Sequence, residues 1–291
     1  MAYFLEQFSN GLAIGGIYAL IALGYSLVYS ILNLINFAHG YVIMVGAFVA
    51  LQLIAFGVDP ALAVFLACCS GALIAMLVER IAYRPVRHAN RVIPMISALG
   101  AGLVLSSFAQ LVWGPEVRAF PQLIPRFPVE IGGVTLSSQS LVILGISIAL
   151  VVASSWFLHR TRFGLAAQCV RQDMAAAQLM GIPVNTVIVA IYALGGFLGV
   201  AGSVLFAMYF NAVFIQMGLL ATTKAWAAAM LGGIGSFQGA FWGGILLGLA
   251  ETAAVVFAGA AYRDGVSMAI IVLVLLLRPA GLFGKSVGER S

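Results

Sequence analysis

Lys224 and Glu251 are the residues best suited to chemistry, because each is an ionisable group inside a long apolar stretch. A charge in such surroundings is costly and usually faces a partner or a water-filled space. Lys224 lies near one end of stretch 219–235, and Glu251 lies towards the matching end of stretch 239–259. Adjacent antiparallel helices would place both at similar depth. We predict that they are close enough to interact, as a polar feature beside a path or as an ion pair locking two helices.

A second candidate is the segment Asn33–Gly40, which contains Asn36 and His39 and interrupts the apolar pattern. The glycine-rich segment Leu231–Gly239 interrupts it again later. Broken helix junctions often line transport paths, because their freed backbone groups need water or protein partners. Two tight turns would give the same pattern, with His39 as an ordinary hydrogen-bonded turn residue. Both interpretations fit the residues.

Residue types that catalyse reactions are not clustered. His39, His88 and His159 are far apart, and no HExxH motif, GxSxG motif or group of carboxylates occurs. Segment 279–286 ends in Gly-Lys-Ser, but Pro279 stands where a phosphate-binding loop needs its first glycine, and no strand precedes it. We therefore expect no enzyme, no catalytic residue, no metal ion and no cofactor, and no ATP site within the chain.

The composition shows which solvent surrounds these residues. Hydrophobic residues make up 63% of the 291, and charged residues make up 8%. A soluble domain carries about 25% charged residues. The mean hydropathy of +1.11 and an uncharged gap from Glu6 to Asp59 require lipid over most of the surface. Spanning segments in lipid are helices or closed barrels, and long unbroken apolar runs indicate helices. We predict an all-α polytopic integral membrane bundle.

A span needs about 20 apolar residues, and nine apolar stretches are candidates, of which the last is short and is tilted, partly re-entrant or wrongly bounded; the expected number is eight to ten. No repeat of 20–50 residues is evident, and an inverted repeat cannot be recognised from the residues alone. The predicted spans cover residues 10–32, 38–57, 60–79, 92–113, 139–158, 185–209, 219–235, 239–259 and 265–277.

The basic residues predict the orientation. Cytoplasmic loops are enriched in Lys and Arg, so nine spans require the N-terminus outside and the C-terminus in the cytoplasm. The net charge of +5 then reflects topology, and we expect no nucleic acid partner. The predicted cytoplasmic set is Arg80, Arg84, Arg87, Arg91, Arg160, Arg162, Arg171, Arg278, Lys285 and Arg290, against Arg118, Arg126 and Arg263 outside.

The two longest connections have distinct predictions. External loop 114–138 is proline-rich, and Val129–Leu136 alternates around Gly132-Gly133, which predicts a small hairpin. It is a docking surface for an external partner or a plain connector. Cytoplasmic loop 159–184 predicts one short amphipathic helix over Phe163–Gly181, which docks on a motor subunit or lies on lipid headgroups.

The whole chain resembles the inner-membrane permease family of high-affinity branched-chain amino acid ABC importers. Together the matching segments are specific for that family, whereas each one alone is weak. Tyr41 departs from an acidic residue common after the His-Gly pair, which weakens any charge-dependent gating there. Ser236–Gly239 also departs from the common pattern. The matching segments are Tyr18–Tyr25, Ile35–Gly40, Glu79–Arg87, Arg162–Gly181, Met230–Ser236 and Gly243–Glu251.

The resemblance implies a single permease domain over residues 1–291, multi-pass in the bacterial inner membrane. It implies a second homologous permease subunit, two cytoplasmic ATP-binding subunits and a periplasmic substrate-binding protein, with alternating access as the mechanism. Related permeases import urea, short amides or other neutral amino acids, and a stand-alone secondary carrier is the rival function. The resemblance makes loop 159–184 the ATPase-coupling loop, with Arg162, Gly164, Arg171, Asp173 and Gly181 as its candidate residues.

Overall fold

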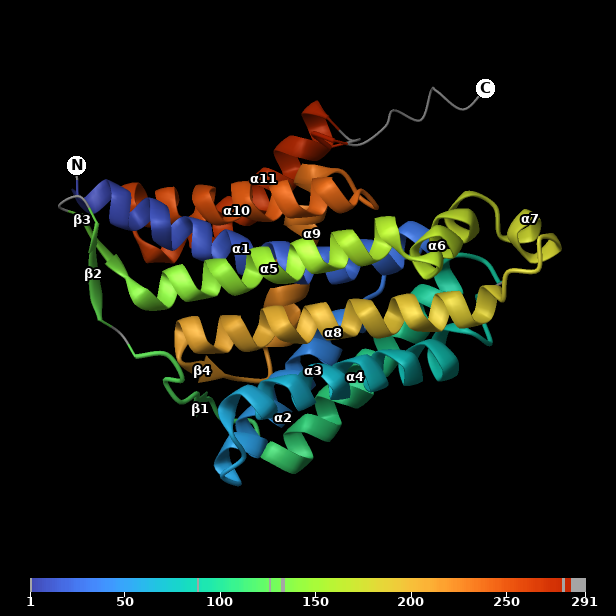
Figure 1. Ribbon diagram of the computed structural model, residues 1–291, viewed down its shortest axis with the longest axis horizontal. Helices are drawn as coiled ribbons and strands as arrows, with labels where there is room; N and C mark the ends of the chain where they lie inside the picture. The colour runs from blue at the N-terminus through green and yellow to red at the C-terminus, as the bar shows by residue number, and fades with distance from the viewer. Residues whose placement is uncertain (1, 88, 126, 132–133, 279–280, 284–291) are drawn as a thin grey trace.

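The computed structural model is a bundle of helices that lie mostly along one direction (Figure 1). It describes residues 2–87, 89–125, 127–131, 134–278 and 281–283. The predicted all-α polytopic fold is confirmed. The long helices are α1 (Ala2–Leu32), α2 (His39–Ala55), α3 (Pro60–Val78), α4 (Val92–Trp113), α5 (Ser138–Arg160), α8 (Val184–Phe210), α9 (Met217–Gly232), α10 (Phe237–Ala258) and α11 (Arg263–Leu277). Shorter helices are α6 (Arg162–Gln172), α7 (Met174–Leu179), the π-helix η1 (Glu79–Tyr83) and the 3-10 helix η2 (Ala260–Tyr262).

Each of the nine predicted spans corresponds to a helix, but the helices are not of equal length. Within the described residues, seven are long and apolar enough to cross a membrane. The helix α2 has 17 residues and α9 has 16. At 1.5 Å per residue these rise only about 24–26 Å, less than the roughly 30 Å of a hydrocarbon core. The helices α2 and α9 are therefore shorter than a full crossing of the hydrocarbon core, and the number of crossings stays a prediction.

The helices form an inner and an outer set. In the most apolar part of α1, 94% of the residues are buried, and in α8 72% are, whereas only 6% are buried in α11. Glycines allow the inner helices to approach closely: a Cβ on Gly24 of α1 would lie 2.5 Å from the carbonyl oxygen of Gly195 on α8. Small residues at helix contacts are typical of packing in lipid, where no water drives apolar faces together.

The backbone contains an internal repeat. The helices α1 and α8 both end at an asparagine with φ +52°, Asn33 and Asn211. The short helices α2 and α9 begin at the same number of residues after each asparagine. Gly57 and Gly235, again at matching positions, have φ +82° and +80° before α3 and α10. Left-handed residues at both matching sites indicate that the two halves follow the same path.

The two halves of the repeat are inverted relative to one another. The chain runs along α1 and back along α8 in opposite directions (Figure 1). Gly24 on α1 contacts Gly195 on α8. Their counterparts in the other half, Gly202 on α8 and Ile17 on α1, also contact each other. Gly40 of α2 meets its own counterpart, Gly218 of α9, where a Cβ on Gly40 would overlap the Gly218 carbonyl oxygen. An approximate two-fold axis therefore passes between α2 and α9.

The connections lie at opposite ends of the bundle. The predicted hairpin is confirmed as β2 (Pro128–Ile131) paired antiparallel with β3 (Val134–Ser137), in the register Val129 to Leu136. A second pair joins β1 (Arg118–Ala119) to β4 (Ala212–Val213), which ties the loop to the end of α8. These strands and the N-terminus lie at one end, and α6 and α7 lie at the other (Figure 1). Several residues used in the sequence predictions lie outside the described residues: His88, Arg126, Gly132, Gly133, Pro279, Lys285 and Arg290.

Candidate functional site

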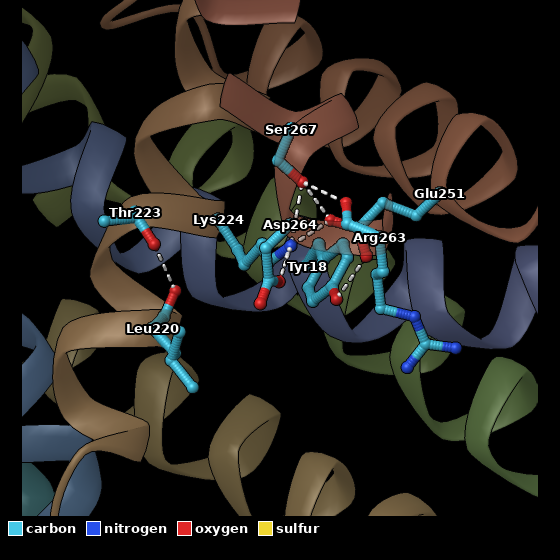
Figure 2. A network of polar contacts seen from close by, with 8 residues as sticks. All are labelled: Tyr18, Leu220, Thr223, Lys224, Glu251, Arg263, Asp264 and Ser267. Carbon is cyan, nitrogen blue, oxygen red and sulfur yellow. Dashed lines mark hydrogen bonds and ion pairs between the residues drawn. The ribbon is translucent and has the colours of Figure 1, made fainter. Parts of the chain in front are cut away.

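A buried polar cluster joins four helices (Figure 2). Lys224 of α9 forms an ion pair with Glu251 of α10, so the predicted contact is present. The Lys224 Nζ also lies 2.8 Å from Oγ of Ser267 and 2.8 Å from Oδ1 of Asp264, both on α11. The hydroxyl of Tyr18 on α1 donates to Glu251 Oε2 at 2.8 Å, and the hydroxyl of Ser267 donates to Glu251 Oε1.

Burial divides the cluster into a closed and an open side. Glu251 and Ser267 have no exposed surface and Lys224 has 5%, whereas the Asp264 side chain is 66% exposed. The carboxylate of Glu251 therefore depends entirely on the cation and on two hydroxyl donors. Breaking a buried pair by removing one partner typically costs 3–5 kcal/mol, because the remaining charge is left uncompensated. This arrangement can hold α11 against the bundle, since Ser267 is the buried residue of that helix.

The inverted repeat has no charged residue at the position that matches Lys224. Lys224 corresponds in the first half to Gly46, at the same interval that separates Asn33 from Asn211. Gly46 packs directly against Val200 of α8, and a Cβ there would overlap the valine side chain. The position of Gly46 thus packs against α8 by apolar contact, whereas the matching Lys224 pairs with residues of α10 and α11. The charged cluster is an addition to the architecture.

The second predicted site is the junction between α1 and α2. Asn36 Oδ1 accepts hydrogen bonds from the backbone N–H of Ala38 at 3.0 Å and from the Tyr83 hydroxyl at 3.2 Å. His39 is 2% exposed and lies 6.2 Å, ring to ring, from Tyr25. Within the described residues, His39 Nε2 and the Tyr25 hydroxyl make no hydrogen bond. The junction is thus a buried polar centre that is only partly satisfied.

The two predicted centres are separate. Among the described residues, no hydrogen bond or ion pair links Asn36 or His39 to Lys224 or Glu251. His39 instead fits between glycines of α1 and α8, since a Cβ on Gly199 would lie 2.9 Å from its ring. The sequence treated them as two candidates, and the structure keeps them apart.

The cytoplasmic segment was predicted as one helix, and that prediction was wrong. Asp173 has an extended backbone, with φ −154° and ψ 112°, which separates α6 from α7. Its Oδ1 accepts hydrogen bonds from the N–H groups of Ala175 and Ala176 at 2.8 and 3.0 Å. An aspartate that caps a helix start competes with continuation of the preceding helix. The predicted end is confirmed, because Gly181 has φ +79°.

The corner between α5 and α6 is tightly defined. The Thr161 hydroxyl accepts a hydrogen bond from the N–H of Gly164 at 3.1 Å and so caps α6, which begins at Arg162. A Cβ on Gly164 would overlap the Leu158 carbonyl, so this position requires glycine. Gln168 Nε2 donates to the same Leu158 oxygen at 3.2 Å. These contacts fix the angle at which α6 leaves the bundle.

The outer surface of α6 and α7 combines charged and apolar side chains. Arg171 and Asp173 are exposed, whereas Val170 and Ala177 of the predicted apolar stripe are buried. The exposed apolar residues are Leu165 at 62%, Leu179 at 89% and Met180 at 82%. Large apolar side chains beside charges on an end surface suit contact with a protein or with lipid headgroups.

Residues 7–275 match the family model described as "Branched-chain amino acid transport system / permease component". The chain belongs to this permease family. The match covers every described helix from α2 to α10 and most of α1 and α11. Membership is therefore shown over both halves of the inverted repeat.

Relatives match the permease over almost their full length. The chain is 37% identical to the high-affinity branched-chain amino acid transport system permease protein BraD of Pseudomonas aeruginosa, covering 99% of this chain and 98% of the relative. It is 35% identical to the corresponding protein LivH of Escherichia coli strain K12, with the same coverage. The solved structure "PsaBC from Streptococcus pneumoniae in complex with Fab" has a TM-score of 0.51 at 14% identity, covering 96% and 93% of the two chains. That likeness concerns the fold alone.

The sequence prediction missed three members of the permease's buried cluster: Tyr18, Asp264 and Ser267. Asp264 carried a signal, because it opens the last apolar stretch beside Arg263. Tyr18 and Ser267 carried none, since single hydroxyl groups are common in membrane helices. Their role became visible only when four helices were placed around one point.

Proposed function

We propose that this permease is the membrane-spanning subunit of an ABC importer and that it translocates branched-chain, neutral aliphatic amino acids by alternating access. The carrying observation is the family match over residues 7–275, together with the printed function of relatives that align over 99% of the chain. Separate ATPase subunits supply the energy. The proposal includes a single permease domain that occupies the whole chain.

The proposed arrangement has the N-terminus outside, the C-terminus in the cytoplasm and the protein in the bacterial inner membrane. Its support is the distribution of arginine. Arg160, Arg162 and Arg171 lie at the end of the bundle that carries α6 and α7, and Arg118 lies at the other end with β1. Positive charge gathers on the cytoplasmic side of membrane proteins.

The proposed partners are assigned to the two ends. Two ATP-binding subunits dock at the ends of a permease pair, one of them on the α6–α7 segment of this chain. The exposed side chains of Leu165, Leu179 and Met180 support that assignment, because they give apolar anchors beside Arg171 and Asp173. A periplasmic substrate-binding protein docks on loop 114–138, and a second homologous permease completes the path.

The proposed role of the Lys224–Glu251 pair is to anchor α11 to α9 and α10 at the edge of the path. The buried contact of Ser267 with both residues supports it. The proposed role of the junction at Asn36 and His39 is to border the path, which the unpartnered Nε2 of His39 supports. Freed polar groups in lipid persist where they meet protein or water.

The test is reconstitution of the permease with its co-purifying subunits in liposomes, with binding protein and labelled leucine outside and ATP inside. We expect leucine uptake that needs both ATP and the binding protein, with competition by valine and isoleucine. Uptake of urea or acetamide in place of leucine would support the alternative cargo. Full activity of this chain alone, without any ATPase, would support a secondary carrier and overturn the proposal.

A further inference from the structure

An apolar groove of about 290 Å³ opens on the side of the bundle between α3, α5 and α8. It is lined by Phe157 of α5, Phe163 in the first turn of α6, Ala72 of α3 and four residues of α8 that include Ala193 and Phe197. All the lining residues are apolar. The volume is at the small end of the range for ligand pockets, which suits a narrow apolar ligand.

The groove lies within the half of the bundle that ends at α6. Phe157 lies within one turn of the end of α5 at Arg160, near the level of the headgroups. Phe197 lies thirteen residues beyond the start of α8 at Val184, which corresponds to a depth of about 20 Å. Half of a hydrocarbon core is roughly 15 Å thick. The lining residues of α8 run from Ala190 to Phe197, about 10 Å along the helix, so the groove has the length for part of an acyl chain in the cytoplasmic leaflet.

Two arginines lie at the headgroup end. Arg160 closes α5 and Arg162 opens α6, and both are exposed. Neither takes part in the ion pairs found among the described residues, which all involve Lys224. Asp173, the acidic residue of the α6–α7 segment, lies at the far end of α6, about 16 Å along the helix. The partial positive charge of the α6 N-terminus adds to that of the arginines.

The groove is held in shape by its own corner. The Thr161 hydroxyl donates to the Phe157 carbonyl at 2.6 Å and accepts from the N–H of Gly164. The rings of Phe157 and Phe163 are 5.6 Å apart at an angle of 35°. A ligand that fills the groove therefore touches both the end of a span and the first turn of α6, without a rearrangement to form its site.

We propose that this groove binds an acyl chain of an anionic phospholipid, whose phosphate lies at Arg160, Arg162 and the N-terminus of α6. Charge complementarity selects the occupant: the groove wall accepts any acyl chain, and the two unpaired cations favour a negative headgroup. A zwitterionic lipid offers a compensated charge, and a neighbouring protein subunit would need an acidic partner for each arginine. The lipid contacts Phe163 and so stabilises α6 in position. This inference does not depend on the cargo.

The experiment measures retained lipid. The full-length chain, purified with its bound subunits, is equilibrated in nanodiscs of phosphatidylglycerol and phosphatidylcholine in equal amounts, returned to detergent and examined by native mass spectrometry. Each surface arginine favours an anionic headgroup about fivefold, so two predict a preference for phosphatidylglycerol of roughly 30-fold. Retention of both lipids in equal amounts by the unaltered protein would overturn the proposal.

Two sets of variants separate the headgroup from the chain. Arg160→Gln with Arg162→Gln should abolish the preference, whereas Arg84→Gln with Arg91→Gln, which also removes two exposed arginines, should keep it. Both pairs are exposed, so folding does not confuse the comparison.

Ala193→Trp fills the groove and should remove the bound lipid, while Ala149→Trp on the exposed face of α5 should not. Lipid retained by Ala193→Trp contradicts the assignment. A subunit lost from Ala193→Trp, with lipid binding unchanged, would show instead that the groove is a contact between proteins.

Discussion

Replacing Lys224 by methionine tests whether the buried cluster behaves as an uncompensated charge when its cation is lost. Glu251 would keep two hydroxyl donors but lose its counter-ion in a site with no exposed surface. Removing one partner of a buried pair costs about 3–5 kcal/mol. A chain of this size loses roughly 2 °C in Tm per kcal/mol, so Tm in detergent should fall by roughly 6–10 °C. The exposed Arg91→Met is the control and should leave Tm unchanged.

A compensated variant distinguishes a structural from a functional pair. Lys224→Met, Glu251→Met and Tyr18→Phe together remove both charges and the hydroxyl that would lose its acceptor. Apolar replacement of a whole buried pair is often neutral or stabilising, so Tm should return to within about 3 °C of the native value. Adding the Glu251→Met variant and the Lys224→Met, Glu251→Met double variant completes a double-mutant cycle, which gives the coupling energy.

Leucine uptake in liposomes completes that test. If the cluster only anchors α11, the combined variant should regain uptake together with Tm. If the ammonium group borders the path, Tm should recover and uptake should not. A single Lys224→Met variant with a Tm within 2 °C of the native protein would refute the reasoning, because it would mean that Glu251 is not dependent on its cation.

Three further predictions concern the backbone and the topology. Asp173→Ala should lower ATP-coupled uptake, whereas Asp173→Asn keeps the cap of α7 and loses only the charge. If the Asn variant takes up leucine and the Ala variant does not, the role of Asp173 is capping. Full uptake by both variants would contradict a motor contact here. Gly40→Ala should lower the free energy of unfolding by about 3 kcal/mol, because the new Cβ would overlap the backbone of α9. Gly100→Ala should be tolerated, because a Cβ at Gly100 meets open space. Cysteines at Arg84 and Arg171, in a background without native cysteines, should both react with an impermeant reagent only in inverted vesicles; labelling from opposite sides would contradict the orientation.

The apolar pattern alone was sufficient to locate the helices. In lipid the backbone N–H and C=O groups must form hydrogen bonds with each other, and a long uncharged stretch does so as a helix. Predicted and observed bounds agree closely for 92–113, which is α4, and for 185–209, which is α8. The pairing of Lys224 with Glu251 was also predictable, because both lay at similar depth in consecutive antiparallel stretches. Glycine and proline at 181–183 correctly marked the end of the cytoplasmic segment.

Other features depended on backbone geometry that periodicity does not encode. The break at Asp173 was missed because its apolar stripe continues on both sides, and only the two cap hydrogen bonds show that the helix ends there. The end of α2 was placed two residues too late and that of α9 three residues too late, because flanking turns such as Gly233–Gly235 are as apolar as the helices. Hydropathy does not distinguish a helical residue from a buried turn.

The tertiary structure alone decided which distant residues share a centre. Tyr18 and Ser267 joined the cluster because α1 and α11 pack on either side of α9 and α10, a juxtaposition that no local pattern records. The inverted repeat was equally invisible in the sequence. Many apolar side chains are interchangeable in lipid, so the two halves retain in common mainly the positions where the backbone turns or touches, such as Asn33 with Asn211 and Gly40 with Gly218. The sequence therefore showed that lipid surrounds the chain and where its helices lie. Only the packing of those helices showed which residues form each site.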